Sequence, residues 1–137
     1  MFLRFIPLFA LLAGLFACSE PPYTNLNNKE LQTLMAQGIP VFDVRRPDEW
    51  RATGVIQGSQ LLTFVDGRGK LAPDFLPKFT QAVAKEQPVI LICRTGNRTS
   101  QLSKYLAEKL GYTKIYNVKN GITKWIGGGL PVRRIGG

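Results

Sequence analysis

The chain has 137 residues, 45% of them hydrophobic and 20% charged, a composition that suits a single globular domain. Its net charge of +9 favours anionic partners, but the basic residues are scattered, and we expect no nucleic-acid binding. The absence of histidine excludes Ser-His-Asp and Cys-His catalytic groups and every metal site that needs imidazole. We expect no metal and no cofactor.

The N-terminus has the pattern of an export signal. Residues 1–4 carry positive charge, residues 5–17 are apolar, and Cys18 follows directly. The apolar run is shorter than the about 20 residues that a membrane-spanning helix needs. Its ending, Leu15-Phe16-Ala17-Cys18, resembles a bacterial lipoprotein signal, which implies cleavage before Cys18 and acylation of this cysteine. The predicted organisation is a signal peptide at 1–17, a tether at 18–23 and a folded domain at 24–135.

The lipoprotein resemblance implies a lipid-anchored protein of the bacterial cell envelope. In a Gram-negative cell, Ser19 after the cysteine implies the periplasmic side of the outer membrane, because an aspartate there is the usual retention signal. Acylation of Cys18 leaves Cys93 as the one free thiol of the folded domain, so no internal disulfide can form. We expect the domain to be a monomer.

Apolar spacing and turn residues predict alternating strands and helices in the folded part. A helix begins after the cap Asn27, has Glu30 in its first turn and ends at Gly38. Apolar runs predict strands at 40–44, 61–65, 89–92 and 115–118. The other predicted helices include Phe75, Phe79 and Val83, then Leu102, Tyr105, Leu106 and Leu110 as a buried stripe, then Ile122 and Trp125. This alternation predicts an α/β fold with a mostly parallel sheet.

A cysteine lies where the apolar strand at 89–92 meets the next helix. The loop reads Cys93-Arg94-Thr95-Gly96-Asn97-Arg98. Gly96 permits a tight turn in which successive N–H groups converge on an anion. The helix N-terminus and two arginines add positive potential, so the thiolate of Cys93 is favoured and the chain can make a nucleophile without histidine. A small buried core residue is the alternative interpretation of Cys93, but a core has no use for two arginines so close by.

The loop resembles the active-site loop of rhodanese domains, and two other stretches resemble the same family. One is Val41-Phe42-Asp43-Val44-Arg45 through Glu49-Trp50, and the other runs from Gly111-Tyr112 through Gly121-Ile122-Thr123-Lys124-Trp125 to Pro131. The resemblance covers about residues 24–132. It implies a three-layer fold in which helices flank a mostly parallel sheet of about five strands. The family often has a histidine where this chain has Val55.

The resemblance also implies the chemistry. Cys93 carries sulfur as a persulfide, moved from thiosulfate or polysulfide-type donors to a thiol or cyanide-like acceptor. The backbone amides from Arg94 to Arg98, through Thr95, Gly96 and Asn97, hold the sulfur anion, while the two arginine side chains attract small anionic donors. Asp43, Arg45 and Glu49 are expected to support the site as a structural ion-pair network. Trp50 and Trp125 are expected in the core.

Three other functions fit parts of the pattern. A sulfur carrier or persulfide-binding module would use the same loop to pass sulfur between proteins. A Cys-dependent phosphatase or arsenate reductase is less favoured, because those loops place more residues between cysteine and arginine than the four found here. No acidic segment is placed as a general acid for a leaving group either. An inactive interaction domain would not need the intact cysteine, glycine and arginines.

The N-terminal pattern can be tested by fatty-acid labelling. Full-length protein should take up labelled fatty acid and fractionate with membranes, because each buried CH₂ of an acyl chain contributes about 0.8 kcal/mol to membrane binding. Cys18→Ser should lose the label, whereas Cys93→Ser, the matched control, should keep it. Equal labelling of Cys18→Ser and wild type would contradict acylation.

Overall fold

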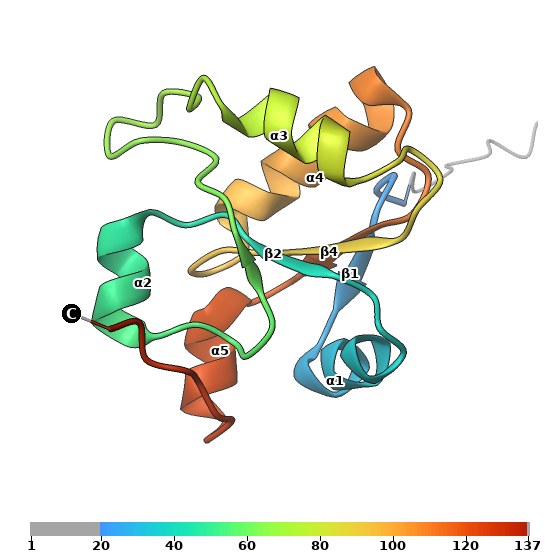
Figure 1. Cartoon of the computed structure of the whole chain (residues 1–137). Helices are drawn as coiled ribbons and strands as arrows, with labels where there is room; N and C mark the ends of the chain where they lie inside the picture. Colours follow the sequence, from blue (N-terminus) through green and yellow to red (C-terminus); the bar gives the residue numbers. More distant parts are fainter. Residues whose placement is uncertain (1–19, 137) are drawn as a thin grey trace, which may run out of the picture.

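The computed structural model describes residues 20–136, so the predicted signal peptide and Cys18 lie outside the described residues. Within 20–136, no helix is long and apolar enough to cross a membrane. Five strands and five helices alternate along this described part of the chain (Figure 1). In chain order they are β1 (Thr24–Leu26), α1 (Asn28–Ala36), β2 (Val41–Asp43), α2 (Pro47–Thr53), β3 (Gln60–Leu61), α3 (Phe75–Ala82), β4 (Val89–Ile92), α4 (Asn97–Leu110), β5 (Ile115–Val118) and α5 (Gly121–Gly127).

The strands form one parallel sheet in the order β1-β5-β4-β2-β3. Helices α3 and α4 cover one face, and α1 and α5 pack on the other (Figure 1). The predicted three-layer α/β fold with a five-stranded parallel sheet is therefore confirmed. Because all strands run the same way, their carboxyl ends share one edge, which is where parallel sheets bind ligands.

Central strand β4 divides the core into two clusters. Val89 and Leu91 face α3 and α4, whereas Ile90 and Ile92 face α1 and α5, and every residue of β4 is fully buried. Cys93 continues this alternation and belongs to the cluster beneath α4. Strand geometry therefore places the thiol on the α4 side of the sheet, at its carboxyl edge.

Strand β3 is shorter than the predicted strand at 61–65, and its neighbour α2 was not predicted. Strand β3 holds only Gln60–Leu61 because its partner β2 ends at Asp43. The chain still runs beside β2, with the N–H of Leu62 donating to the carbonyl of Asp43 at 3.1 Å. Helix α2 begins at Pro47, a residue well suited to the first position of a helix.

Helix α4 buries the predicted face except at one position, Tyr105. Leu102 and Leu106 are fully buried as expected, but Tyr105 is 43% exposed. Thr99 and Ser103 take the remaining buried positions, because residues at spacings of three, four and seven share one side of a helix. Helix α4 therefore presents a hydroxyl to the core directly beside Cys93.

Candidate active site

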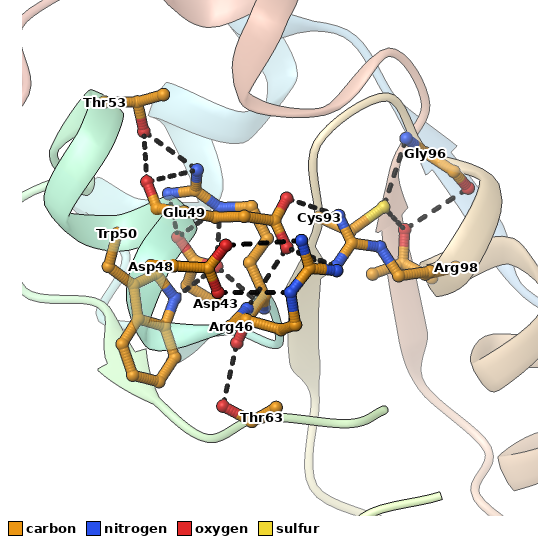
Figure 2. A network of polar contacts seen from close by, with 12 residues as sticks. Asp43, Arg46, Asp48, Glu49, Trp50, Thr53, Thr63, Cys93, Gly96 and Arg98 are labelled. Carbon is orange, nitrogen blue, oxygen red and sulfur yellow. Dashed lines mark hydrogen bonds and ion pairs between the residues drawn. The ribbon is translucent and has the colours of Figure 1, made fainter. Parts of the chain in front are cut away.

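The sulfur of Cys93 is buried and hydrogen-bonded. The residue is 1% exposed. The N–H of Gly96 donates to Sγ at 3.2 Å, and the hydroxyl of Thr99 lies 3.3 Å from the same atom (Figure 2). The N–H of Gly96 is a donor to the sulfur, and hydrogen bonds to a charged acceptor are stronger than those between neutral groups. The hydroxyl of Thr99 has one proton, which reaches either Sγ or the carbonyl of Gly96 at 3.4 Å. Thr99 was not predicted as a site residue, because its position depends on which face α4 turns inward.

Helix α4 begins beside this sulfur. Gly96 is its N-cap, with a left-handed φ of 96°, and Asn97 is the first helical residue. The N–H groups of a first helical turn have no acceptor within the helix, and the helix dipole is positive at this end. The loop therefore presents partial positive charge to Cys93 without any basic side chain.

The turn between β5 and α5 is in direct backbone contact with the Cys93 loop (Cys93–Arg98). A Cβ at Gly96 would overlap the carbonyl group of Lys119, and a Cβ at Gly121 would overlap the backbone of Arg94. Both glycines also have positive φ, 96° and 62°. Neither position accepts a side chain without a shift of the loop, so Gly121 belongs to the site although its place there was not predicted.

Helix α5 orients the peptide groups that follow the thiol. The N–H of Ile122 donates to the carbonyl of Cys93 at 2.9 Å, and the N–H of Thr123 donates to the carbonyl of Arg94 at 3.1 Å. No peptide bond among residues 20–136 is cis, and in a trans peptide the N–H points opposite to the C=O. The N–H groups of Arg94 and Thr95 therefore point away from α5. Helix α5 packs on the face of the sheet opposite the Cys93 side chain, so these N–H groups point towards the side of the sulfur.

The two arginines of the loop have different environments. Both terminal nitrogens of Arg98 contact the carboxylate oxygens of Glu49 at 2.7 Å, a bidentate pair that joins α4 to α2 (Figure 2). Arg94 is exposed and forms no ion pair with any residue in 20–136. Both side chains were predicted to attract donors, but of these two arginines Arg98 is paired with Glu49 and Arg94 is not paired within residues 20–136.

Glu49 stays ionised at all physiological pH values. Partial burial raises its pKa, but hydrogen bonds from Arg98 and the N–H of Arg46, with the charges of both residues, outweigh burial and lower the pKa from 4.5 to about 2. The same hydrogen bond raises the pKa of Arg98. A depressed carboxyl pKa stabilises the folded state fully above about pH 4.5, and this contribution is lost as the pH falls towards 2.

Asp43 and Arg45 form a fully buried ion pair behind α2. Nη2 of Arg45 lies 2.9 Å from Oδ2 of Asp43 and also donates to the carbonyl of Gly54 at 3.0 Å, while Nη1 donates to the hydroxyl of Thr53 at 2.8 Å. The indole N–H of Trp50 also donates to Asp43, at 3.0 Å (Figure 2). Trp50 is thus half-buried against this pair and is not part of the core, in contrast to Trp125.

Val55 is fully buried and pairs with Arg133 through an isolated antiparallel bridge. The N–H of each residue donates to the carbonyl of the other, at 2.9 and 2.7 Å. An apolar side chain suits such an enclosed position, since a buried polar group would need its own partner.

The site is a buried cysteine in a tight loop at the carboxyl edge of a five-stranded parallel sheet. The chain belongs to the rhodanese-like domain family, whose model matches residues 27–127. It is 32% identical over 92 residues to the thiosulfate sulfurtransferase GlpE of Tolumonas auensis, an alignment that spans 67% of this chain and 76% of that protein. The resemblance to rhodanese domains is therefore confirmed.

Solved structures agree with this assignment. Rv0390 from M. tuberculosis shares 27% identity and a TM-score of 0.63, with 82% of this chain and 99% of that chain covered. The 30 kDa polysulfide-sulfur transferase homodimer from Wolinella succinogenes shares 28% identity and a TM-score of 0.65, with 83% of this chain and 80% of that chain covered.

The contact at Gly121 predicts a loss of thiol reactivity. Gly121→Ala should slow alkylation of Cys93 by iodoacetamide about tenfold or more, because a shift of the loop misplaces the groups that stabilise the thiolate. Gly127→Ala, in the same helix and with nothing within 4 Å of the added Cβ, is the matched control. Identical alkylation profiles for the two variants, with folding verified by circular dichroism, would show that the turn does not shape the loop.

Proposed function

We propose that this protein moves sulfane sulfur from small anionic donors to a thiophilic acceptor through a persulfide on Cys93. The observation that carries the proposal is the environment of Sγ, where the N–H of Gly96 lies at 3.2 Å and the hydroxyl of Thr99 at 3.3 Å. These groups stabilise a thiolate before the reaction and a sulfur anion after it. Membership of the rhodanese-like family supports the same chemistry.

The first step forms the persulfide. The thiolate of Cys93 attacks the outer sulfur of thiosulfate, the S–S bond of thiosulfate breaks, and sulfite leaves with the electron pair. Charge is conserved, since thiolate and thiosulfate dianion become persulfide anion and sulfite dianion. Because Cys93 is 1% exposed, the attacking sulfur accepts only a small or slender donor.

The second step returns the enzyme to its starting state. A persulfide places the transferable sulfur about 2 Å beyond Sγ, so the acceptor does not need to reach as deep as the donor. The acceptor attacks this outer sulfur, the S–S bond breaks, and the thiolate of Cys93 leaves with the electron pair. The loop that stabilised the first thiolate stabilises the leaving group as well.

Arg94 supplies the charge that attracts the donor. It follows Cys93 directly, is exposed, and has no ion-pair partner among the residues that the structure describes. An exposed cation beside a reactive group raises the local concentration of anions, with an effect that salt screens. Thiosulfate and polysulfide are both anionic, so both fit this part of the proposal.

Phosphate chemistry is less well supported. A phosphatase loop needs its terminal arginine to contact the phosphate oxygens, but Arg98 is held by Glu49 through two contacts of 2.7 Å. Breaking a bidentate, partly buried pair would be costly. The relatives named above include a thiosulfate sulfurtransferase and a polysulfide-sulfur transferase, in line with sulfur chemistry.

The proposal is tested by intact-mass analysis of the protein after exposure to thiosulfate. Wild type should gain one sulfur atom, which cyanide removes as thiocyanate, and should catalyse repeated turnover with thiosulfate and cyanide. Cys93→Ser should lose both properties because it lacks the nucleophile, whereas Cys18→Ser should keep them. Turnover by Cys93→Ser would contradict the mechanism. Sulfur loading without multiple turnovers would assign the domain as a sulfur carrier.

A further inference from the structure

The hydroxyl group of Thr99 lies between two acceptors in the buried part of the site. Its oxygen is 3.3 Å from Sγ of Cys93 and 3.4 Å from the carbonyl oxygen of Gly96. Thr99 is fully buried on α4, so no water molecule competes for its proton. A hydroxyl hydrogen rotates about the C–O bond to suit its surroundings, but it points to one acceptor at a time. The proton of Thr99 is therefore shared between sulfur and carbonyl by competition.

The charge on Sγ decides this competition. When Cys93 is a thiolate, the full negative charge is on Sγ, and a hydrogen bond to a charged acceptor is stronger than one to a neutral carbonyl. When Cys93 carries a second sulfur, Sγ has two covalent bonds and is only a weak acceptor, like the sulfur of a thioether. The formal charge then lies on the outer sulfur, about 2 Å further away. The proton should face Sγ in the thiolate and Gly96 in the persulfide.

The outer sulfur has other donors. The N–H groups of Arg94 and Thr95 point towards the side of the sulfur, because their peptide carbonyls are oriented by α5. Both of these residues are exposed, whereas Thr99 is fully buried. In the proposed function an acceptor must reach the outer sulfur, which therefore lies towards the exposed loop. Thr99 contacts the inner sulfur from the opposite, buried side.

We infer that the hydroxyl of Thr99 stabilises the thiolate of Cys93 more than its persulfide, and that it thereby sets how readily the domain releases sulfur. The inference rests on the proposed function, because it compares the two forms of the same cysteine. A donor that favours the thiolate shifts the loading equilibrium towards the sulfur-free protein. The same donor stabilises the thiolate as it leaves during discharge. Thr99 is thus a catalytic residue of sulfur release.

The equilibrium that Thr99 controls balances without another reagent. In loading, the thiolate of Cys93 and the thiosulfate dianion become the persulfide anion and the sulfite dianion. In the reverse direction, sulfite attacks the outer sulfur, the S–S bond to Cys93 breaks, and the thiolate leaves with the electron pair. Neither direction needs a proton, an oxidant or a reductant. The ratio of thiosulfate to sulfite therefore fixes the fraction of protein that is loaded.

The test measures this equilibrium in variants of Thr99. Each protein is incubated with thiosulfate and sulfite at known ratios near pH 10, above the value of about 8.5 at which free thiols ionise. The loaded fraction is read by intact mass. Thr99→Val keeps the shape of the side chain but lacks the hydroxyl, and it should shift the equilibrium constant towards persulfide about tenfold. Cyanide should also discharge its persulfide more slowly than that of the wild type.

Two further variants separate the hydroxyl from side-chain packing. Thr99→Ser restores the hydroxyl and should keep the equilibrium constant close to that of the wild type. Thr99→Ala has a smaller side chain than Thr99→Val, so it should show the same shift if only the hydroxyl matters. Ser103→Ala is the matched control. Ser103 lies one turn further along α4, is fully buried, and its hydroxyl has no hydrogen-bond partner within residues 20–136.

An unchanged equilibrium constant in Thr99→Val, with folding verified by circular dichroism, would overturn the role of Thr99. An equal shift in Ser103→Ala would also overturn it, because the loss of any buried hydroxyl would then have the same effect. A shift in Thr99→Ser as large as that in Thr99→Val would assign the effect to packing. Failure of the wild type to gain sulfur at any ratio of thiosulfate to sulfite would instead contradict the proposed function.

Discussion

The site depends on a backbone contact between the Cys93 loop and the turn that leads into α5. Two hydrogen bonds from α5 hold the carbonyls of Cys93 and Arg94, at 2.9 and 3.1 Å. Since a trans peptide has its N–H opposite its C=O, these bonds turn the neighbouring amides towards the sulfur side of the sheet. The close approach requires glycine at both Gly96 and Gly121. A thiolate can thus be stabilised in a chain that has no histidine to activate it.

Charged side chains hold the framework around this loop. The Arg98–Glu49 pair joins α4 to α2, and the buried Asp43–Arg45 pair holds α2 against the end of β2. Burial of such an ion pair has a large desolvation cost. The remaining N–H groups of Arg45 offset part of this cost by donating to the hydroxyl of Thr53 and the carbonyl of Gly54. Arg94 alone among the loop residues keeps its charge available to ligands. Formal charge therefore organises the framework of the site, and in the proposed mechanism Arg94 attracts the anionic donor while backbone dipoles act on the sulfur.

The sequence predicted the parts of this arrangement that are local. The apolar run of β4, the glycine turn and the start of α4 lie within a dozen residues, so their pattern predicts a cysteine at the carboxyl edge of a parallel sheet. Long-range contacts left no local signal. Glu49 and Arg98 are 49 positions apart, and Gly121 meets Arg94 only after a further helix and strand have formed. On α4 the buried leucines were predicted, but Tyr105 was wrongly placed in the core and the buried Thr99 was missed, because apolar spacing alone does not indicate a buried hydroxyl.

A crystal structure of the protein after treatment with thiosulfate would test the central claim most directly. The account predicts that the outer sulfur of the Cys93 persulfide accepts hydrogen bonds from backbone N–H groups of the loop and the first turn of α4. The carbonyls of Cys93 and Arg94 should remain bonded to Ile122 and Thr123. An outer sulfur held by the guanidinium of Arg94, with the loop amides turned away, would contradict the account.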